Sequence, residues 1–276
     1  MKPFDVINSL PENLNVSPFV GQIFETIERI ALSGMSVLIV GEQGTEKESL
    51  ARIVHLLSVR RNEKFISMDC EYLLPRIAEK KIFGVENLCV KGIEIYQGIF
   101  EKAYGGTIFF NNICKLSYEL QVKISNTLRT RHFHRLDGVD ELGINVRLIT
   151  SINEPYNDIV TVPYRKADLY YRMCPLSINI PPLRETREDI IFMIDKFIHN
   201  MSIPISKSIR GISDEALKYF LNYNWPANTE QLQKAVEDSI MVCQNHTIEV
   251  NHLPRYLLKD GSEFLENNFK SIQPLI

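Results

Sequence analysis

Hydrophobic positions follow two patterns that alternate along the first two thirds of the chain. Short segments rich in apolar residues, of the kind that form strands, occur at 37–40, 65–68, 107–110, 146–149 and 177–180. Between them, apolar residues recur at helical spacing and predict helices over 19–32, 47–59 and 118–128. Strands that alternate with helices over about 180 residues predict an α/β fold, with a parallel sheet and helices on both faces.

The pattern changes after Pro182, where only helical periodicity remains. We expect helices over 187–201, 213–223 and 228–244, with Ser213 and Asn228 as N-caps, and no strand. This part reads as a small helical bundle. The expected organisation is therefore an irregular segment at 1–18, an α/β core at 19–182, a helical lid at 183–258 and a polar tail at 259–276.

Composition and charge narrow the functional class only slightly. The hydrophobic fraction is 45%, the charged fraction is 24% and the net charge is −3, so no overall bias toward nucleic acid is present. The five cysteines are widely spaced and form no CxxC, which argues against a zinc site or a disulfide framework. Neither a signal peptide nor an apolar run long enough for a membrane span is found, so a cytoplasmic protein is expected.

The segment SVLIVGEQGTEKESL, at 36–50, has the layout of a phosphate-binding loop: strand, glycine loop, lysine and helix. Loop N–H groups and the helix N-terminus hold phosphates in such a loop, and the lysine reaches the terminal phosphate. The candidate nucleotide-binding residues are Gly41, Glu42, Gly44, Thr45, Glu46, Lys47 and Glu48. The general pattern asks for glycine at position 46 and serine or threonine at position 48, and this chain has glutamate at both.

With these segments in view, the chain from Phe19 to Leu258 resembles the central AAA+ ATPase domain of bacterial enhancer-binding activators of sigma-54 RNA polymerase. The segment GEQGTEKES resembles the family's G-E-x-G-T-G-K-E loop, in which glutamate follows the lysine. Further blocks occur in the family's order: IFG, GIFEKAYGGTIFF, LSYELQVKISNTLRTRHFHRLDG, DLYYR, IPPLR and NWPANTEQL. The resemblance implies an AAA+ P-loop NTPase-like α/β core followed by a helical lid.

At several positions where the family has a residue that takes part in the reaction, this chain has a residue of different chemistry. The family's loop glycine is Glu46, which adds a negative charge facing an anion, at a cost of about 1–4 kcal/mol. The family's Asp-Glu pair, which would hold Mg²⁺ and activate water, is Asn111-Asn112. An amide binds a metal weakly and takes no proton, so we expect no bound metal and a loss of about 10²–10⁴ in rate from the missing base alone. A structural alternative is that both asparagines end the strand and cap the next turn.

Supporting positions depart from the family pattern as well. Asp69 replaces an asparagine that would orient the glutamate, and Ile152 replaces the threonine of the sensor segment. Of two arginines that would act across a subunit boundary, Arg172 is kept and the other is Lys166. Glu230 replaces the nucleotide-sensing arginine of the lid. No intact catalytic set is therefore expected.

The family's sigma-54 contact motif, G-A-F-T-G-A, corresponds to residues 88–93, of which only Gly92 matches. Its aromatic residue and threonine are Val90 and Lys91 here. We therefore expect the chain to lack the contact element for remodelling sigma-54.

Weaker candidates lie outside these blocks. His132 and His134 could ligate a metal, but an exposed surface pair is the favoured reading. Basic residues that could contact nucleic acid, but better fit a solvated or interface face, are Lys123, Arg129, Arg131 and Arg135. Trp225 is expected in a core, and no helix-turn-helix follows Pro254.

Together these features predict a degenerate transcription-regulator module, defective in ATP hydrolysis and in sigma-54 remodelling. It would act by protein–protein assembly, as a homo- or hetero-oligomer through its AAA+ faces, with the transcription machinery or a related AAA+ regulator as partner. A ligand-responsive form would keep ATP or another nucleotide as an effector. The alternative is a weakly active ATP-dependent sigma-54 activator domain that relies on Lys47 and Arg172.

Overall fold

The computed structural model describes residues 17–89, 92–153, 173–202 and 209–258. These residues fall into two compact units. The first holds the described residues within 23–41 and 47–180, and the second holds those within 17–22, 42–46 and 181–258. Each unit has a hydrophobic core of its own.

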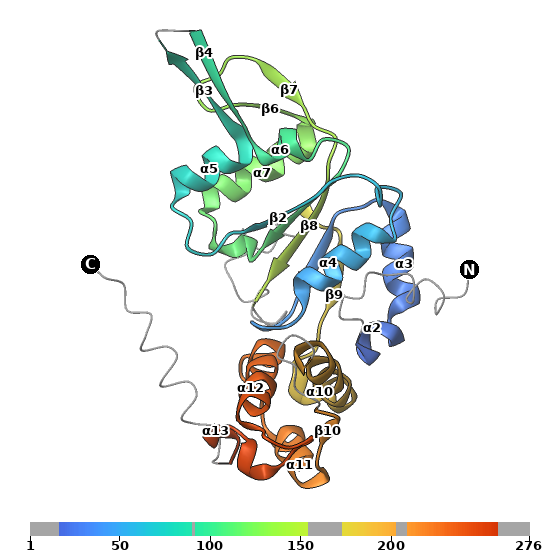
Figure 1. The fold of residues 1–276 in the computed structure, drawn as a ribbon. Helices are drawn as coiled ribbons and strands as arrows, with labels where there is room; N and C mark the ends of the chain where they lie inside the picture. Colours follow the sequence, from blue (N-terminus) through green and yellow to red (C-terminus); the bar gives the residue numbers. More distant parts are fainter. Residues whose placement is uncertain (1–16, 90–91, 154–172, 203–208, 259–276) are drawn as a thin grey trace. The chain divides into compact units, whose positions relative to one another are not determined.

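A five-stranded parallel sheet forms the centre of the first unit, in the order β2-β5-β8-β1-β9 (Figure 1). Its strands are β1 (Val37–Val40), β2 (Phe65–Asp69), β5 (Thr107–Asn111), β8 (Arg147–Ile152) and β9 (Leu176–Asn179). Each overlaps one of the five predicted apolar runs. Because the strands are parallel, their carboxyl ends meet at one edge of the sheet, where open α/β sheets bind ligands.

Helices cover both faces of this sheet, as the sequence predicts. They are α3 (Phe24–Ser33), α4 (Lys47–Leu56), α5 (Pro75–Phe83), α6 (Ile99–Lys102) and α7 (Tyr118–Thr130), with a short 3₁₀ turn, η1 (Ile113–Lys115). Figure 1 shows α3 and α4 on one side and α5 and α7 on the other. Leu38 and Val40 pack with residues of α5 and α7, and α4 lies against β1, β2 and β5. The predicted helix at 19–32 is interrupted at Ile23, and its first part is a separate short helix, α2 (Pro18–Gln22).

Two hairpins extend the first unit beyond the sheet. The strands β3 (Gly84–Cys89) and β4 (Gly92–Gln97) pair antiparallel, as do β6 (His132–His134) and β7 (Glu141–Gly143). The Glu86 N–H donates to Leu136 O at 2.9 Å, and the hairpins lie side by side (Figure 1). The sequence pattern predicted no strand between residues 69 and 106, so the β3–β4 hairpin was missed.

The second unit is mainly helical. Its elements are α2, η2 (Leu183–Glu185), α10 (Arg187–Ser202), α11 (Asp214–Asn222), α12 (Asn228–Val242), η3 (Val250–His252) and α13 (Arg255–Leu258). Trp225 is fully buried and stacks on Phe220, with ring centroids 5.6 Å apart, as predicted for a core residue. A small parallel pair, β10 (Gly211–Ile212) with β11 (Thr247–Ile248), contradicts the expectation that this part holds no strand. Two residues per strand are too few to leave a pattern in the sequence.

The two predicted helix caps have different outcomes. The Ser213 side chain accepts from the Ala216 N–H at 3.3 Å, which confirms it as the cap of α11. The prediction for Asn228 was wrong, because Ala227 holds the cap position of α12 and the Asn228 side chain bonds elsewhere. Among the described helices, none is both long and apolar enough to cross a bilayer.

Candidate functional site: a phosphate loop held by lid residues

The phosphate loop begins where β1 ends at the edge of the sheet. Gly41 follows the strand, and Lys47 is the first residue of α4. The Lys47 side chain is buried, and its Nζ donates to Gly41 O at 3.1 Å, so the lysine lies back along the loop. Glu48 pairs with Arg52 one turn along α4 at 2.7 Å, on the outside of the helix. The predicted strand, loop, lysine and helix are therefore present in that order.

Residues 42–46 of the loop belong to the second unit, together with the lid helices. The Glu42 carboxylate accepts two hydrogen bonds from the Arg184 guanidinium, at 2.6 and 2.9 Å. This bond is the main reason why the pKa of Arg184 lies above its ordinary value. Within the loop, the Thr45 hydroxyl donates to Glu42 O at 2.7 Å and closes a tight turn.

The start of α12 holds the loop through its backbone. Asn228 Nδ2 donates to Gln43 O at 2.8 Å and to Glu42 Oε2 at 3.3 Å. The N–H of the next residue, Thr229, donates to Gly44 O at 3.0 Å. Gly44 has φ +76°, and a Cβ there would collide with the backbone oxygen of Ala227. Only glycine fits this close approach.

Glu46 lies near a lysine of α10. Burial lowers the pKa of Lys196, and the nearby charge of Glu46 partly opposes that shift. Both side chains are half-buried. The negative charge that Glu46 adds to the loop therefore favours the charged form of a lid lysine.

The carboxyl ends of β5 and β8 bring three polar side chains together. Ser151 Oγ donates to Asn111 Oδ1 at 2.6 Å and accepts from the Asn112 N–H at 3.0 Å. Asn112 is 1% exposed and has φ +59°, in the left-handed region that asparagine tolerates. Its Oδ1 accepts from Cys114 Sγ at 2.9 Å, and its Nδ2 has no hydrogen-bond partner among the described residues.

These contacts revise the structural alternative for the two asparagines. Asn111 ends β5 as expected. Asn112 stands at the cap position of η1, but its side chain makes no capping hydrogen bond, so that part of the prediction was wrong. Neither side chain supplies a carboxylate, and the buried amide of Asn112 does not face solvent.

The other predicted site residues are spread over the structure. Asp69 is exposed at the end of β2, next to Asn111 in the strand register, and its Oδ1 accepts from the Glu71 N–H at 2.9 Å. Ile152 is buried at the end of β8, opposite Val40. Glu230 is exposed in the first turn of α12. Lys166 and Arg172 lie outside the described residues, as do Val90 and Lys91 of the expected sigma-54 contact segment.

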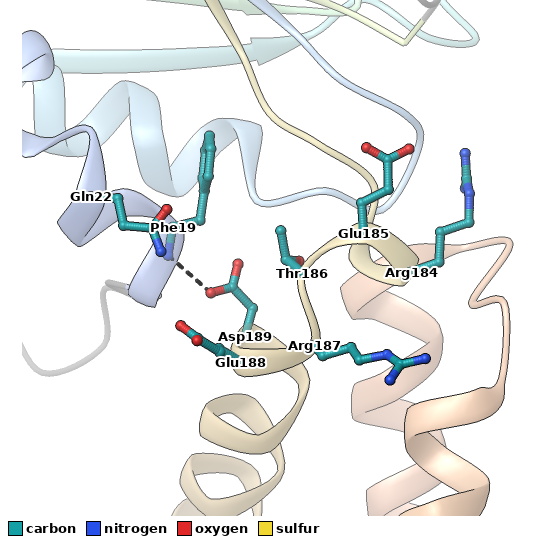
Figure 2. A pocket seen from close by; sticks show the side chains of 8 residues that line it. All are labelled: Phe19, Gln22, Arg184, Glu185, Thr186, Arg187, Glu188 and Asp189. Atoms are coloured by element: carbon teal, nitrogen blue, oxygen red, sulfur yellow. Dashed lines mark hydrogen bonds between the residues drawn. The ribbon is translucent and has the colours of Figure 1, made fainter.

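A hollow of about 370 Å³ lies at the start of α10, and no pattern in the sequence indicated it. Its lining residues are Phe19, Gln22, Arg184, Glu185, Thr186, Arg187, Glu188 and Asp189 (Figure 2). The Asp189 carboxylate is almost fully buried and accepts from the Phe19 N–H at 3.0 Å. Burial raises the pKa of Asp189 in spite of this bond. No periodicity joins two residues 170 positions apart, so sequence reasoning could not have found the hollow.

The weaker candidates have different outcomes. His132 and His134 are exposed, as predicted, and each Nδ1 lies within 3.0 Å of a different backbone carbonyl oxygen. In the part of the chain that the structure describes, no three His, Cys, Asp or Glu residues are grouped to hold a metal. Two of the four clustered basic residues are paired, Lys123 with Glu79 at 2.8 Å and Arg135 with Glu101 at 2.7 Å.

Comparison with known proteins identifies the family. Residues 14–179 match the sigma-54 interaction domain family, and residues 184–268 match the AAA+ ATPase lid domain. The transcriptional activator RocR of Bacillus subtilis is 34% identical over 89% of this chain and 54% of its own length. The transcriptional regulatory protein XylR of Pseudomonas putida is 35% identical over 86% of this chain and 42% of its own length.

The chain thus spans about half the length of these curated relatives. Among solved structures, NtrX from Brucella abortus superimposes with a TM-score of 0.79 at 24% identity, covering 99% of this chain and 62% of NtrX. That likeness concerns the fold, and it confirms the predicted AAA+ P-loop NTPase-like α/β core with a helical lid. The chain belongs to the sigma-54 interaction domain family and carries the AAA+ lid domain after it.

Proposed function

We propose that this chain is a transcription-regulator module of the sigma-54 activator class that does not hydrolyse ATP at a useful rate. It acts in the cytoplasm by assembling with copies of itself, with a related AAA+ regulator or with the transcription machinery. The family supports a role in transcription, since relatives of about a third identity are named as activators and regulators.

One observation carries the loss of hydrolysis: the strand end at Asn111 and Asn112 offers no carboxylate. Asn112 is buried, and its carbonyl oxygen is already bonded to Cys114. The Asn112 amide could not take a proton from a water molecule beside it, so it cannot act as a general base. The amide of Asn111 already accepts from Ser151, so the donor set does not fit Mg²⁺, which prefers carboxylates and phosphates.

Phosphate binding is a separate question from hydrolysis. Lys47 and the loop N–H groups are the residues that would hold phosphates. Glu46 opposes them with a negative charge, which Lys196 partly neutralises. In the ligand-responsive form of the proposal, a nucleotide binds to these loop groups as an effector without turnover. NtrX, which shares the fold, has been crystallised with ATP.

Phosphate release from ATP and Mg²⁺ tests the main proposal. We expect release at the level of buffer, and no change in Lys47→Ala, because the base and the metal ligand are both missing. Lys81→Ala, at an exposed position of α5, is the matched control. Turnover that Lys47→Ala abolishes and Lys81→Ala preserves would establish the alternative, a weakly active ATPase.

Binding to sigma-54 tests the second part independently. The segment that corresponds to the family's contact motif, 88–93, includes the last residues of β3 and the first of β4, and its sequence differs from the motif. We expect immobilised chain to retain no sigma-54 with or without ATP. A chain in which residues 88–93 are replaced by the family's G-A-F-T-G-A is the positive comparison, since it restores the contact motif and leaves residues 84–87 of β3 and 94–97 of β4 unchanged. Retention by the native chain would contradict the proposal.

A further inference from the structure

We propose that residues 42–46 of the phosphate loop are held by the lid through a clasp of side-chain and backbone contacts, which makes anion binding to the loop less favourable. The clasp consists of Glu42, Gln43, Gly44 and Glu46 of the loop with Arg184, Lys196, Asn228 and Thr229 of the lid. This inference deepens the proposed function and rests on it, because a loop without turnover does not need to open and close in each cycle.

Asn228 connects the parts of the clasp. Its side chain is fully buried, accepts from the Leu183 N–H at 2.8 Å and donates to Gln43 O at 2.8 Å. One amide thereby joins η2, the loop and the start of α12. Asn228 holds φ +48°, an unusual conformation that surrounding contacts must maintain. A buried polar group with all its bonds made is costly to remove, because each partner is then left unsatisfied.

The ionic part adds charge neutralisation. The Arg184 guanidinium donates one hydrogen bond to each carboxylate oxygen of Glu42. Arginine–carboxylate pairs are strongest in this two-bond geometry. The pair is partly exposed and would contribute little alone, so its effect comes from acting with the buried backbone contacts. Lys196 supplies a second lid cation beside Glu46. Two lid cations thus face the loop's own carboxylates.

A consequence follows for an incoming phosphate. An anion that binds the loop meets two carboxylates within five residues and competes with them for the lid cations. Removing those carboxylates should therefore open the clasp and strengthen anion binding together. Contacts that serve only for packing would not change loop opening and anion affinity together, so measuring both distinguishes them from a clasp.

Hydrogen–deuterium exchange of the peptide that spans 42–46 tests the closed state in the full chain without nucleotide. We expect slow exchange in the native chain and faster exchange in Asn228→Ala and Glu42→Gln. Asn222→Ala, exposed at the end of α11, and Glu237→Gln, paired with Lys234 within α12, are the matched controls. The fluorescence of Trp225 confirms that each variant keeps a folded lid. Unchanged exchange in a folded Glu42→Gln variant would overturn the clasp.

Calorimetric titration with ATP in the absence of Mg²⁺ tests the competition. We expect Glu42→Gln/Glu46→Gly to bind ATP about tenfold more tightly than the native chain, with no gain in phosphate release. Equal affinity, with no change in exchange, would refute the clasp and leave the proposed function standing. Turnover that depends on Lys47 would refute the proposed function, and the exchange results would still decide whether the clasp exists.

Discussion

At Asp189, a buried carboxylate makes the stability of the second unit depend on pH. Three groups donate hydrogen bonds to it: the Phe19 N–H and the hydroxyls of Ser17 and Thr186. Each lowers the pKa of Asp189, but together they do not offset the rise caused by burial. The pKa of Asp189 in the folded state is therefore raised above the unfolded value of about 3.9. Protonation then favours the folded state. That contribution is fully present below the unfolded pKa and is lost as the pH rises through the folded pKa.

Asp189→Asn should remove this dependence, because an amide keeps the acceptor oxygen and carries no charge. We expect its melting temperature to exceed that of the native chain at pH 7, with a difference that shrinks as the pH falls toward 4. Thermal unfolding followed by Trp225 fluorescence at several pH values measures this. Asp195→Asn, exposed on the same helix, is the control, and a lower melting temperature for Asp189→Asn at pH 7 would contradict the argument.

At the scale of elements, the β3–β4 hairpin is anchored by one arginine. Arg135 donates to Glu101 of α6 at 2.7 and 2.9 Å and to Glu86 of β3 at 3.5 Å, and all three side chains are 11–14% exposed. Hydrogen bonding to Glu101 is the main cause that raises the pKa of Arg135. An ion pair this deep leaves an uncompensated charge when one partner is removed.

Arg135→Met should therefore destabilise the first unit by about 3 kcal/mol. It should also speed amide exchange throughout 84–97, since the hairpin loses its anchor. Urea unfolding followed by far-ultraviolet circular dichroism gives the first quantity, and exchange mass spectrometry gives the second. Arg129→Met, exposed on α7, should change neither. A hairpin that keeps its protection in Arg135→Met would show that the strand pairing alone holds it.

The elements differ in how far the sequence predicted them. The strands β1 and β5 are mostly apolar because helices bury both of their faces, and that pattern is local. The hairpin was missed because Glu86 and Asn87 break the apolar run and because its support comes from Arg135, far along the chain. Asn228 was read as a helix cap from its position, and its nonlocal partners determine its role instead.

At the scale of the molecule, the two hydrophobic cores offer separate readouts. The chain has one tryptophan, Trp225, and it lies in the core of the second unit. Its fluorescence therefore follows the lid, while circular dichroism follows both units. Phe220, stacked on Trp225, and Phe110, in the first core, are both fully buried.

Phe220→Ala should destabilise the lid by about 3–5 kcal/mol and shift the fluorescence transition to lower urea concentration. Phe110→Ala should shift mainly the circular dichroism transition of the first unit. Equilibrium unfolding of both variants with both probes measures this. If the two probes moved together in each variant, the units would unfold as one cooperative body.

The sequence predicted only part of the candidate site, because the contacts that complete the site join residues far apart in the chain. The motif located the loop from Gly41 to Lys47, and the resemblance pointed to Asn111 and Asn112. The partners of the loop were not predictable, since Glu42 and Arg184 lie 142 positions apart and no pattern links them. Propensity and periodicity report on neighbours in sequence, whereas the clasp is made by tertiary contacts.

Because residues 42–46 belong to the same unit as the lid, the point at which the protein is truncated affects any measurement on the loop. A fragment that stops after β9 would keep Gly41 and Lys47 but would lose Arg184, Lys196, Asn228 and Thr229. Its loop would be free of every lid contact described above, and it would bind anions differently from the loop of the intact chain. Affinities measured on such a truncated protein would belong to the fragment alone.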